Sequence, residues 1–323
     1  MSPTDGSGPL LSVVIPNWNG AHFLPTCLDS LTRQSWPALE TIAVDNASTD
    51  NSRDLLRRDY PSVQLIELSQ NNGFTGACNA GLRVARGELV ALLNNDTEVH
   101  PEWAFEVVAA FRRHPRAGAV ASKMLLFDRR DHLHTAGDCF SLDGRASNRG
   151  VWQRDCGQFE SEEYVFSACG GAAVYRRRML DQIGLLDDDF FFSCEDVDLG
   201  WRAQLAGWRC IYTPRAIVYH HLSATGGGVT ASYYDGRNLI YLLAKNYPAD
   251  LWRLYGRRVL RAQWGLLREA LAAWRGAEAR ARLRGMLAGL MGLPRMLRKR
   301  SAIQASRQVS RQYLEELLGE SVS

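Results

Sequence analysis

The chain has 323 residues, of which 46% are hydrophobic and 23% charged. This length allows one full catalytic domain plus an appendage, and this composition excludes a disordered or fibrous protein. No window approaches the roughly eighteen uncharged apolar residues that a spanning helix needs, so we expect no transmembrane helix. Residues 1–9 predict a flexible N-terminus without the basic and apolar segments of a signal peptide.

The seven cysteines are scattered along the chain and include no C-x-x-C pair. An odd number without metal-ligand spacing argues against a disulfide framework and against a zinc site. It is typical of a protein from a reducing compartment, in which most cysteines serve as small core residues.

The small net charge of +3 conceals an uneven distribution. From Asp250 to the C-terminus there are 15 Lys and Arg residues against 6 Asp and Glu, whereas the rest of the chain is mildly acidic. A strongly basic tail indicates an anionic partner for this part of the chain.

Up to about residue 120, short apolar runs alternate with amphipathic stretches. This alternation predicts parallel strands joined by crossover helices, the arrangement of an α/β domain. We predict strands near 11–16, 40–45, 63–68, 88–94 and 118–122, and helices near 22–34, 51–59, 74–86 and 101–113.

Between residues 127 and 164 the periodicity weakens, which predicts an irregular insertion or a small antiparallel extension. Strand-like runs return at 169–175 and 216–219. Between them, a run of aromatic residues leads into acids that start a helix ending near residue 206.

After Pro248 the sequence becomes rich in Leu, Arg and Ala, which predicts helices that break at Pro294. We therefore place a catalytic domain at 10–247 and a basic amphipathic helical extension at 248–323. An apolar stripe recurs here at spacings of three and four, bordered by arginines: Leu260, Trp264, Leu267, Leu271 and Trp274, with Arg257, Arg261, Arg268 and Arg275. Such a helix either lies in a membrane interface or packs on the catalytic domain with its arginines solvated.

Three polar residues, Asn94, Asn95 and Asp96, follow the buried strand predicted near 88–94. In open α/β sheets, ligands bind at the carboxyl ends of the strands. Carboxylate and amide oxygens suit Mg²⁺ or Mn²⁺, so Asp96 is the expected metal ligand. His221 follows a later strand as a possible third ligand, with the glycine-rich segment behind it as a mobile lid. A plain turn after the strand and an ordinary surface loop around His221 are the alternatives.

Three other predicted strands also end in polar clusters, so four strands deliver polar residues to one edge of the sheet. Asp45 at one of these ends either accepts a hydrogen bond from a base or forms an Asx turn or helix cap. Small residues near 71–81 either let a backbone approach a phosphate or ribose, or let a helix pack closely. The expected nucleotide-binding residues are Pro16, Asn17, Asn19, Asp45, Asn72, Gly73 and Asn95.

Two adjacent carboxylates, Glu195 and Asp196, follow the aromatic run, with Asp198 close behind. Partial desolvation and like charge would raise the pKa of such a pair, and one member could take a proton from a hydroxyl acceptor. Acids that merely stabilise the first turn of a helix are the alternative.

Taken in order, these motifs resemble those of glycosyltransferase family 2, inverting enzymes with the nucleotide-diphospho-sugar transferase fold called GT-A. The resemblance covers residues 10 to about 245 and is nearest to bacterial rhamnosyltransferase-like members acting on lipid-linked cell-surface glycans. The matching stretches are 14–20, 44–50, 72–74, 79–81, 93–96, 170–172 and 195–198, with His221, Ser223 and Thr225.

The resemblance implies a role for each matching residue and an α/β GT-A fold with a mostly parallel mixed sheet. Asp45 would read a uracil or thymine base, and Asp196 would be the catalytic base beside Glu195. Asp96 would be the metal-binding acid of the family's D-x-D motif, assisted by His221. The first acid of that motif is Asn94 in this chain, and because an amide gives the metal less charge, we expect weaker metal binding.

The resemblance also implies a function: metal-dependent transfer of a sugar, with Mg²⁺ or Mn²⁺, from dTDP-rhamnose or a UDP-sugar. The acceptor would be a hydroxyl of a cell-surface glycan or a polyprenyl-linked glycan, reached by a cytoplasmic enzyme held peripherally on the inner face of the cell membrane. The alternative is a weak or inactive GT-A protein serving as a membrane-associated scaffold. A pyrophosphorylase or a dehydrogenase would carry a glycine-rich loop after the first strand, which this chain lacks. The catalytic part also lacks the combination of aromatic and basic residues that would predict nucleic-acid binding.

Overall fold

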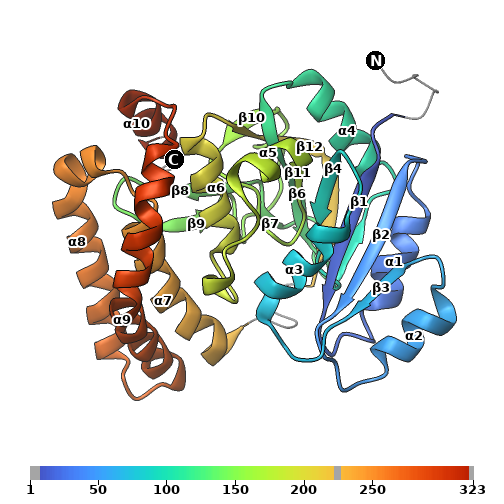
Figure 1. Ribbon diagram of the computed structural model, residues 1–323, viewed down its shortest axis with the longest axis horizontal. Helices are drawn as coiled ribbons and strands as arrows, with labels where there is room; N and C mark the ends of the chain where they lie inside the picture. The colour runs from blue at the N-terminus through green and yellow to red at the C-terminus, as the bar shows by residue number, and fades with distance from the viewer. Residues whose placement is uncertain (1–7, 222–226, 320–323) are drawn as a thin grey trace.

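The computed structural model describes residues 8–221 and 227–319, and one mixed β-sheet forms its centre (Figure 1). The strands are β1 (Leu11–Asn17), β2 (Leu39–Asp45), β3 (Gln64–Glu67), β4 (Leu89–Leu92), β5 (Thr97–Val99), β6 (Ala117–Leu126), β7 (Leu133–Thr135), β8 (Asp138–Phe140), β9 (Ala146–Asn148), β10 (Glu163–Val165), β11 (Ala173–Arg176) and β12 (Arg209–His220). Across the sheet they run β10-β12-β6-β11-β4-β1-β2-β3, with β5 on β12 and β7 on β6, while β8 and β9 form a separate hairpin. Strands β1 to β4 pair in parallel and β11 runs antiparallel between β4 and β6, which confirms the mostly parallel mixed sheet.

Helices cover both faces of the sheet, because alternate residues of its inner strands point to opposite sides. In β1, Leu11, Val13 and Ile15 pack in the core of one face, and Val14 packs in the core of the other. The helices are α1 (Leu24–Thr32), α2 (Ser52–Asp59), α3 (Gly73–Val84), α4 (Trp103–Arg113), α5 (Arg177–Ile183), the short 3-10 helix η1 (Asp188–Phe190), α6 (Glu195–Leu205), α7 (Gly228–Lys245), α8 (Ala249–Ala272), α9 (Ala277–Ala305) and α10 (Arg311–Gly319). The strands and helices predicted up to residue 120 are confirmed within a few residues.

The middle of the chain is an antiparallel extension, one of the two predicted forms. Strands β7 and β10 add to the sheet in antiparallel fashion, and β8 pairs with β9 in the hairpin. The strand predicted at 169–175 begins only at Ala173, because the backbone turns through Cys169–Ala172, closed by a hydrogen bond from the Ala172 N–H to the Cys169 carbonyl.

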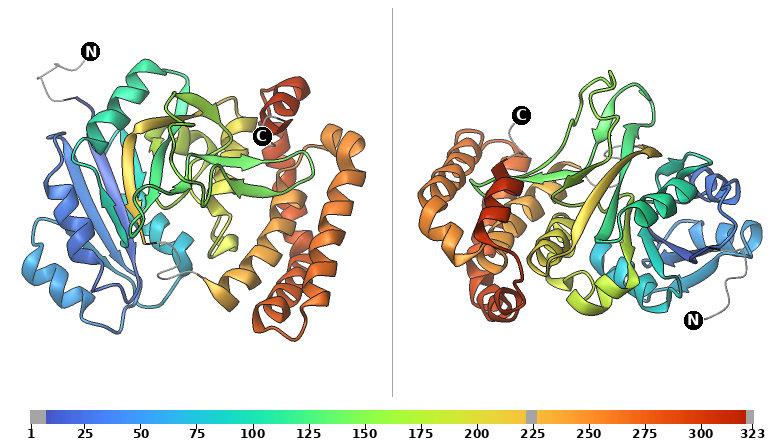
Figure 2. Two further views of the ribbon diagram at one scale, coloured as in Figure 1. Left: turned by 180° about the vertical axis from the view of Figure 1, so that it is seen from behind. Right: turned by 90° about the horizontal axis from the view of Figure 1, so that it is seen from above.

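The C-terminal helices stack at the end of the molecule opposite β2 and β3 (Figure 2). Helix α7 was not among the predicted elements, and α9 packs against it backbone to backbone. A Cβ atom on Gly285 would lie 2.0 Å from the carbonyl oxygen of Tyr233, so only glycine permits this approach. The helix break predicted at Pro294 is wrong, since α9 continues through it. Pro294 is exposed, so water can satisfy the carbonyl that its missing N–H leaves free.

One apolar core joins α6 to the C-terminal helices across the boundary proposed near residue 247. Trp201 of α6, Leu242 of α7, Val259 of α8 and Met296 of α9 all belong to it, and each is fully buried. The predicted mobile lid at the glycine-rich segment and the flexible N-terminus fall mainly on residues outside the described ranges.

Candidate active site

A cavity of about 770 Å³ lies between the carboxyl ends of β1 and β4 and the helices α6 to α9. One wall carries residues that follow the strands: Pro16, Asn17, Trp18, Asn46, Asn71, Gly73, Phe74, Asn94 and Asn95. The opposite wall carries acids, apolar groups and arginine side chains from the hairpin and the helices, among them Asp138, Glu195, Asp196, Asp235, Leu266 and Arg282. We call these the strand wall and the helix wall.

Amide side chains hold the strand wall together. The Asn95 side chain donates to Asn17 Oδ1 over 2.7 Å, and the Asn46 side chain donates to Asn71 Oδ1 over 2.9 Å. Of the predicted nucleotide-binding residues, Pro16, Asn17, Gly73 and Asn95 line the cavity. Trp18, Asn46, Asn71 and Phe74 also line it and were not predicted, although all four stand within or beside the motifs quoted above.

Asn19, Asp45 and Asn72 do not line the cavity. Asp45 is fully buried, and its Oδ2 accepts a 3.1 Å hydrogen bond from the Ser48 backbone in an Asx turn. Its Oδ1 receives only a long 3.4 Å contact from Asn17. The turn that sequence alone leaves as an alternative is therefore present, and one oxygen of Asp45 stays weakly engaged.

Asp96 and His221 are neighbours through the backbone and not through their side chains. The His221 N–H donates to the Asp96 carbonyl over 3.0 Å, while the imidazole stacks on Phe127 with ring centroids 3.6 Å apart. The Asp96 carboxylate contacts His220 Nε2 at 3.1 Å, and His220 Nδ1 lies 3.1 Å from His134 Nδ1. His134 is buried in β7, and burial lowers its pKa to about 3.

The residues after β4 fit a hard divalent cation in donor type. Asn94 Oδ1 is buried and has no hydrogen-bond partner among the described residues, so an oxygen donor stands free two residues from the Asp96 carboxylate. Within residues 8–221 and 227–319, no cluster of three His, Cys, Asp or Glu side chains is arranged to hold a metal. The candidate donor set is thus one carboxylate and one amide.

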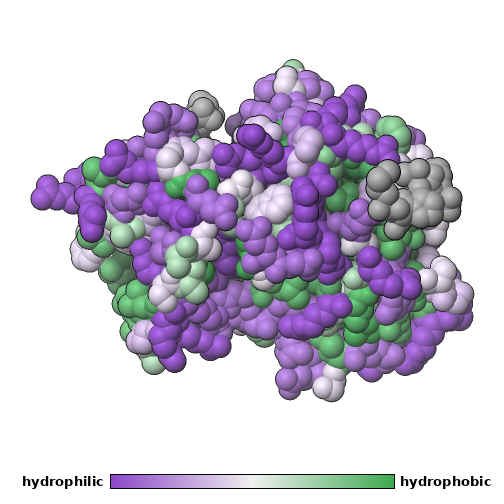
Figure 3. All heavy atoms as spheres, turned by 45° about the horizontal axis from the view of Figure 1, so that its top comes forward, coloured by the Kyte–Doolittle hydropathy of each residue, from purple (hydrophilic) through white to green (hydrophobic). Residues whose placement is uncertain are grey.

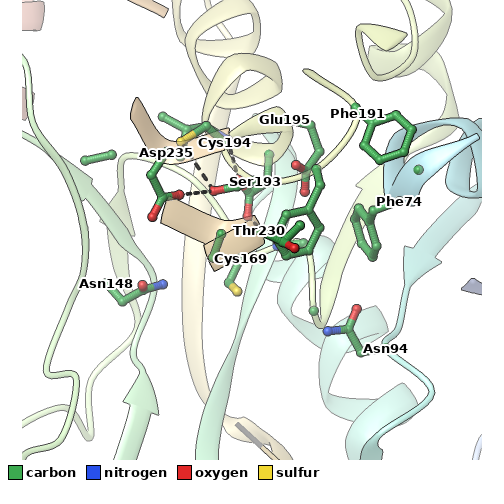
Figure 4. A pocket seen from close by; sticks show the side chains of 18 of the residues that line it. Phe74, Asn94, Asn148, Cys169, Phe191, Ser193, Cys194, Glu195, Thr230 and Asp235 are labelled. Carbon is green, nitrogen blue, oxygen red and sulfur yellow. Dashed lines mark hydrogen bonds between the residues drawn. The ribbon is translucent and has the colours of Figure 1, made fainter. Parts of the chain in front are cut away.

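The paired acids begin α6 and face the cavity. Asp196 Oδ2 accepts a 2.7 Å hydrogen bond from the Gly170 backbone, and its Oδ1 accepts one of 2.8 Å from the Val197 backbone. Glu195 is buried, and its Oε2 has no partner in the described part of the chain. Figure 4 shows the Glu195 carboxylate beside Ser193, with Asn94 on the far side of the cavity. Asp198 instead points into the protein, where it binds Arg202 and Lys245.

Residues 12–184 match the model of the family described as glycosyl transferase family 2, which is more than half of the chain. The chain belongs to glycosyltransferase family 2. The match ends before Glu195, so the helix wall of this glycosyltransferase lies largely outside the family model.

Relatives agree with this assignment. An uncharacterized protein, y4gI, of Sinorhizobium fredii is 30% identical over 70% of this chain, which spans only about a quarter of that protein (26%). An N-acetylglucosaminyl-diphospho-decaprenol L-rhamnosyltransferase of Mycobacterium tuberculosis is 27% identical over 80% of this chain and 91% of its own length. The solved mannosyltransferase PcManGT of Pyrobaculum calidifontis, in complex with GDP-Man and Mn²⁺, superposes with a TM-score of 0.56 at 18% identity, covering 97% of this chain and 88% of its own. This likeness confirms the GT-A fold.

In this glycosyltransferase, the surroundings of the two neighbouring acids shift their pKa values differently. Burial, and then the charge of Asp196, raise the pKa of Glu195 well above its usual range. Burial also raises the pKa of Asp196, but the backbone N–H groups of Gly170 and Val197 oppose that rise. Because hydrogen bonds to a carboxylate favour its charged form, the pair holds its proton on Glu195 and its charge on Asp196. A third buried acid, Asp138, has its pKa raised by burial and by Asp196.

A strained loop presents the pair to the cavity. Phe191, Ser193 and Cys194 have φ values of 60°, 68° and 65°, a left-handed backbone that non-glycine residues adopt at a cost of about 1 kcal/mol or more each. Gly73 of the strand wall fits against this loop, because a Cβ atom there would lie 2.4 Å from the Phe191 carbonyl oxygen. The loop thus links the two walls.

Helix α7 holds that loop in place. The fully buried Asn238 side chain donates to the carbonyls of Phe190, Phe192 and Ser193 over 3.0, 2.8 and 2.7 Å. Asp235, one turn earlier on α7, accepts a 2.6 Å hydrogen bond from the Ser193 hydroxyl, drawn as a dashed line in Figure 4. Asn238 was not predicted, since nothing near it in the sequence marks it as facing residues 45 positions away.

Proposed function

We propose that the enzyme transfers a sugar, with inversion, from a nucleoside-diphosphate sugar to a hydroxyl of a cell-surface or lipid-linked glycan. The observation that carries this proposal is the carboxylate of Asp196, oriented by two backbone N–H groups and facing an uncharged amide wall across one cavity. The name of the M. tuberculosis relative, a rhamnosyltransferase acting on a diphospho-decaprenol, supports dTDP-rhamnose or a UDP-sugar as the donor and a polyprenyl-linked acceptor.

The strand wall would bind the nucleotide. Pro16, Asn17 and Asn95 offer backbone and amide groups to base and ribose, and the half-exposed Trp18 offers an aromatic face. Asp45 would accept a hydrogen bond from an N–H group of the base, which would replace its weak contact with the Asn17 side chain. Asn19 and Asn72 would act by fixing the loops, since Asn19 Oδ1 accepts from the Thr49 backbone and the Asn72 N–H donates to Asn46.

The helix wall would bind the acceptor and carry the proton transfer. Asp196 takes the proton of the acceptor hydroxyl while the hydroxyl oxygen attacks the anomeric carbon of the donor sugar. The bond from that carbon to the leaving diphosphate breaks on the opposite side. Glu195, protonated and with an unpartnered oxygen, can donate to a second acceptor oxygen without adding charge.

Asp96 and the amide oxygen of Asn94 would hold Mg²⁺ or Mn²⁺, with the imidazole of His221 or of its neighbour His220 as a further ligand. When bound, the cation neutralises the charge that develops on the departing diphosphate. The structure favours His220 over His221 as the imidazole partner, because His220 is the one that contacts Asp96.

The enzyme would work in the cytoplasm, against the inner face of the cell membrane. No helix in the described part of the chain is long and apolar enough to cross a bilayer. We expect no nucleic-acid partner.

A screen of nucleoside-diphosphate sugars tests the proposed function. The true donor should raise the melting temperature, because a ligand that binds the folded state stabilises it. It should also be hydrolysed slowly, and faster with Mn²⁺ than with a chelator. Binding without any hydrolysis or transfer, with either cation and any acceptor analogue, would favour the scaffold alternative.

A further inference from the structure

The outer face of α8 exposes large apolar side chains that no part of the described chain covers. Leu260 is 64% exposed and Trp264 59%, followed along the helix by Leu271 (49%) and, just past its end, Trp274 (56%). The alternative that this stripe packs on the catalytic domain is therefore wrong for these four residues. On the left of Figure 3, over the C-terminal helices, hydrophobic residues lie interspersed with hydrophilic ones.

Arginines flank these side chains on the same face. Residues 257, 261, 264, 268 and 271 recur at spacings of three and four, which places them on one side of the helix. Arg257, Arg261, Arg268 and Arg275 are exposed, and none has an acidic partner within residues 8–221 and 227–319. Some exposed arginines elsewhere do have an acidic partner, for example Arg57 with Glu67 and Arg58 with Asp59.

We propose that this α8 face, made of Leu260, Trp264, Leu271 and Trp274 with the four arginines, docks on an anionic lipid bilayer. Unpaired guanidinium groups on long stems can reach lipid headgroups while tryptophan and leucine enter the acyl boundary. A second copy of the chain is a poorer occupant, because two such faces would bring unpaired arginines together. The neighbouring helix α9 adds exposed apolar residues, including Leu287, Leu290 and Met291.

The placement of this face suits an acceptor held in the membrane. Leu266, half a turn around α8 from Arg257, lines the helix wall of the cavity, and Arg282 of α9 lines it too. A bilayer on the α8 face would thus lie about one helix diameter, roughly 10 Å, from the acceptor side of the cavity. This docking rests on exposure and charge alone and does not depend on the reaction proposed above.

Sedimentation of the full chain with lipid vesicles tests the proposal without donor or acceptor. Vesicles of phosphatidylcholine with phosphatidylglycerol should bind the protein at least about tenfold better than phosphatidylcholine alone, and high salt should weaken that binding. Two variants should each lose most of it: one combining Trp264→Ser with Trp274→Ser, the other combining Arg257→Gln, Arg261→Gln, Arg268→Gln and Arg275→Gln.

Matched controls change the same residue types elsewhere. Trp152→Ser removes an exposed tryptophan, and Arg33→Gln with Arg83→Gln removes exposed unpaired arginines, so these variants should bind vesicles as the parent does. Unaltered melting temperature and donor-induced stabilisation would show that all variants are folded.

Three results would overturn the proposal. The first is negligible binding of the parent to both kinds of vesicle. The second is a dimer, seen by sedimentation velocity, that the tryptophan variant dissociates while vesicle binding is absent. The third is salt-sensitive binding to single-stranded DNA with no partition onto vesicles. Loss of vesicle binding with donor hydrolysis intact would leave the proposed reaction standing, so the two claims fail separately.

Discussion

The two walls of the cavity differ in charge and in origin. The strand wall is built of amides and aromatic rings on the loops that follow β1 to β4 and at the start of α3, and it carries little formal charge. The helix wall carries Asp138, Glu195, Asp196 and Asp235, and its shape depends on α7, whose residues lie about 45 positions from the loop that they hold. The strand wall offers amide groups and the helix wall carries the Asp196 carboxylate, so we expect the donor diphosphate on the strand wall and the hydroxyl acceptor on the other side.

The largest expected effect comes from removing the base. Asp196→Asn keeps the side-chain shape but cannot take a proton, so kcat should fall on the order of a hundredfold or more, with the donor dissociation constant nearly unchanged. Steady-state kinetics and calorimetry measure the two quantities. The control is Asp181→Asn, which changes an exposed aspartate in the same way. Near-normal turnover of Asp196→Asn would show that Asp196 is not the catalytic base.

Substitution of the proposed metal ligand Asp96 should weaken donor binding and leave proton transfer unaffected. Asp96→Ala should weaken Mn²⁺-linked binding of the nucleoside diphosphate by about tenfold, because one carboxylate supplies most of the site's charge. The comparison of His220→Ala with His221→Ala sharpens the assignment. We expect the larger loss of Mn²⁺-linked binding for His220→Ala, since His220 contacts Asp96. A larger loss for His221→Ala would support His221, the ligand predicted from the sequence.

Asn238→Ala tests whether α7 positions the acids. Losing three hydrogen bonds to the loop should lower kcat by about tenfold and displace the acidic limb of its pH profile, while donor binding to the strand wall changes little. Asn51→Ala, an exposed asparagine whose side chain caps nothing, serves as the control. If stability falls but kcat and its pH profile stay constant, Asn238 is structural only.

The smallest effect is a stability change at Glu195. Burial raises the pKa of this acid in the folded state, so the wild-type protein loses stability as pH rises from the unfolded pKa through the folded one. Glu195→Gln has no proton to lose and should become more stable than wild type by about 1 kcal/mol or more, or about 2 °C in melting temperature, as pH rises through that range. Below the usual pKa of glutamate the gain should vanish. The exposed Glu88→Gln should show no such pH dependence.

The strand wall was predictable because its signals are local. An apolar run that stops at Asn17 or at Asn94 marks both a strand and the polar residues at its end, and parallel strands bring those ends together. Asp45 illustrates the limit of this inference. An aspartate at the end of a strand can bind a base or form an Asx turn, and in the structure Asp45 forms the turn.

The helix wall was predictable only where its acids are adjacent in sequence. The choice between His220 and His221 depends on the register of β12, because a shift of one residue in a strand turns the side chain to the other face. Leu266 and Arg282 reach the cavity, and Asn238 reaches the loop behind it, through helix packing that no local pattern encodes. The exposure of Trp264 likewise needed the structure, since an apolar stripe predicts burial and membrane contact equally well.

The anomeric configuration of the first product tests the central claim most directly. If the helix wall supplies only a base and the acceptor attacks across the cavity, proton NMR during turnover should show a product whose anomeric configuration is inverted relative to the donor. A product that retains the donor configuration from the earliest time points would contradict this account, because a single in-line displacement inverts the anomeric carbon.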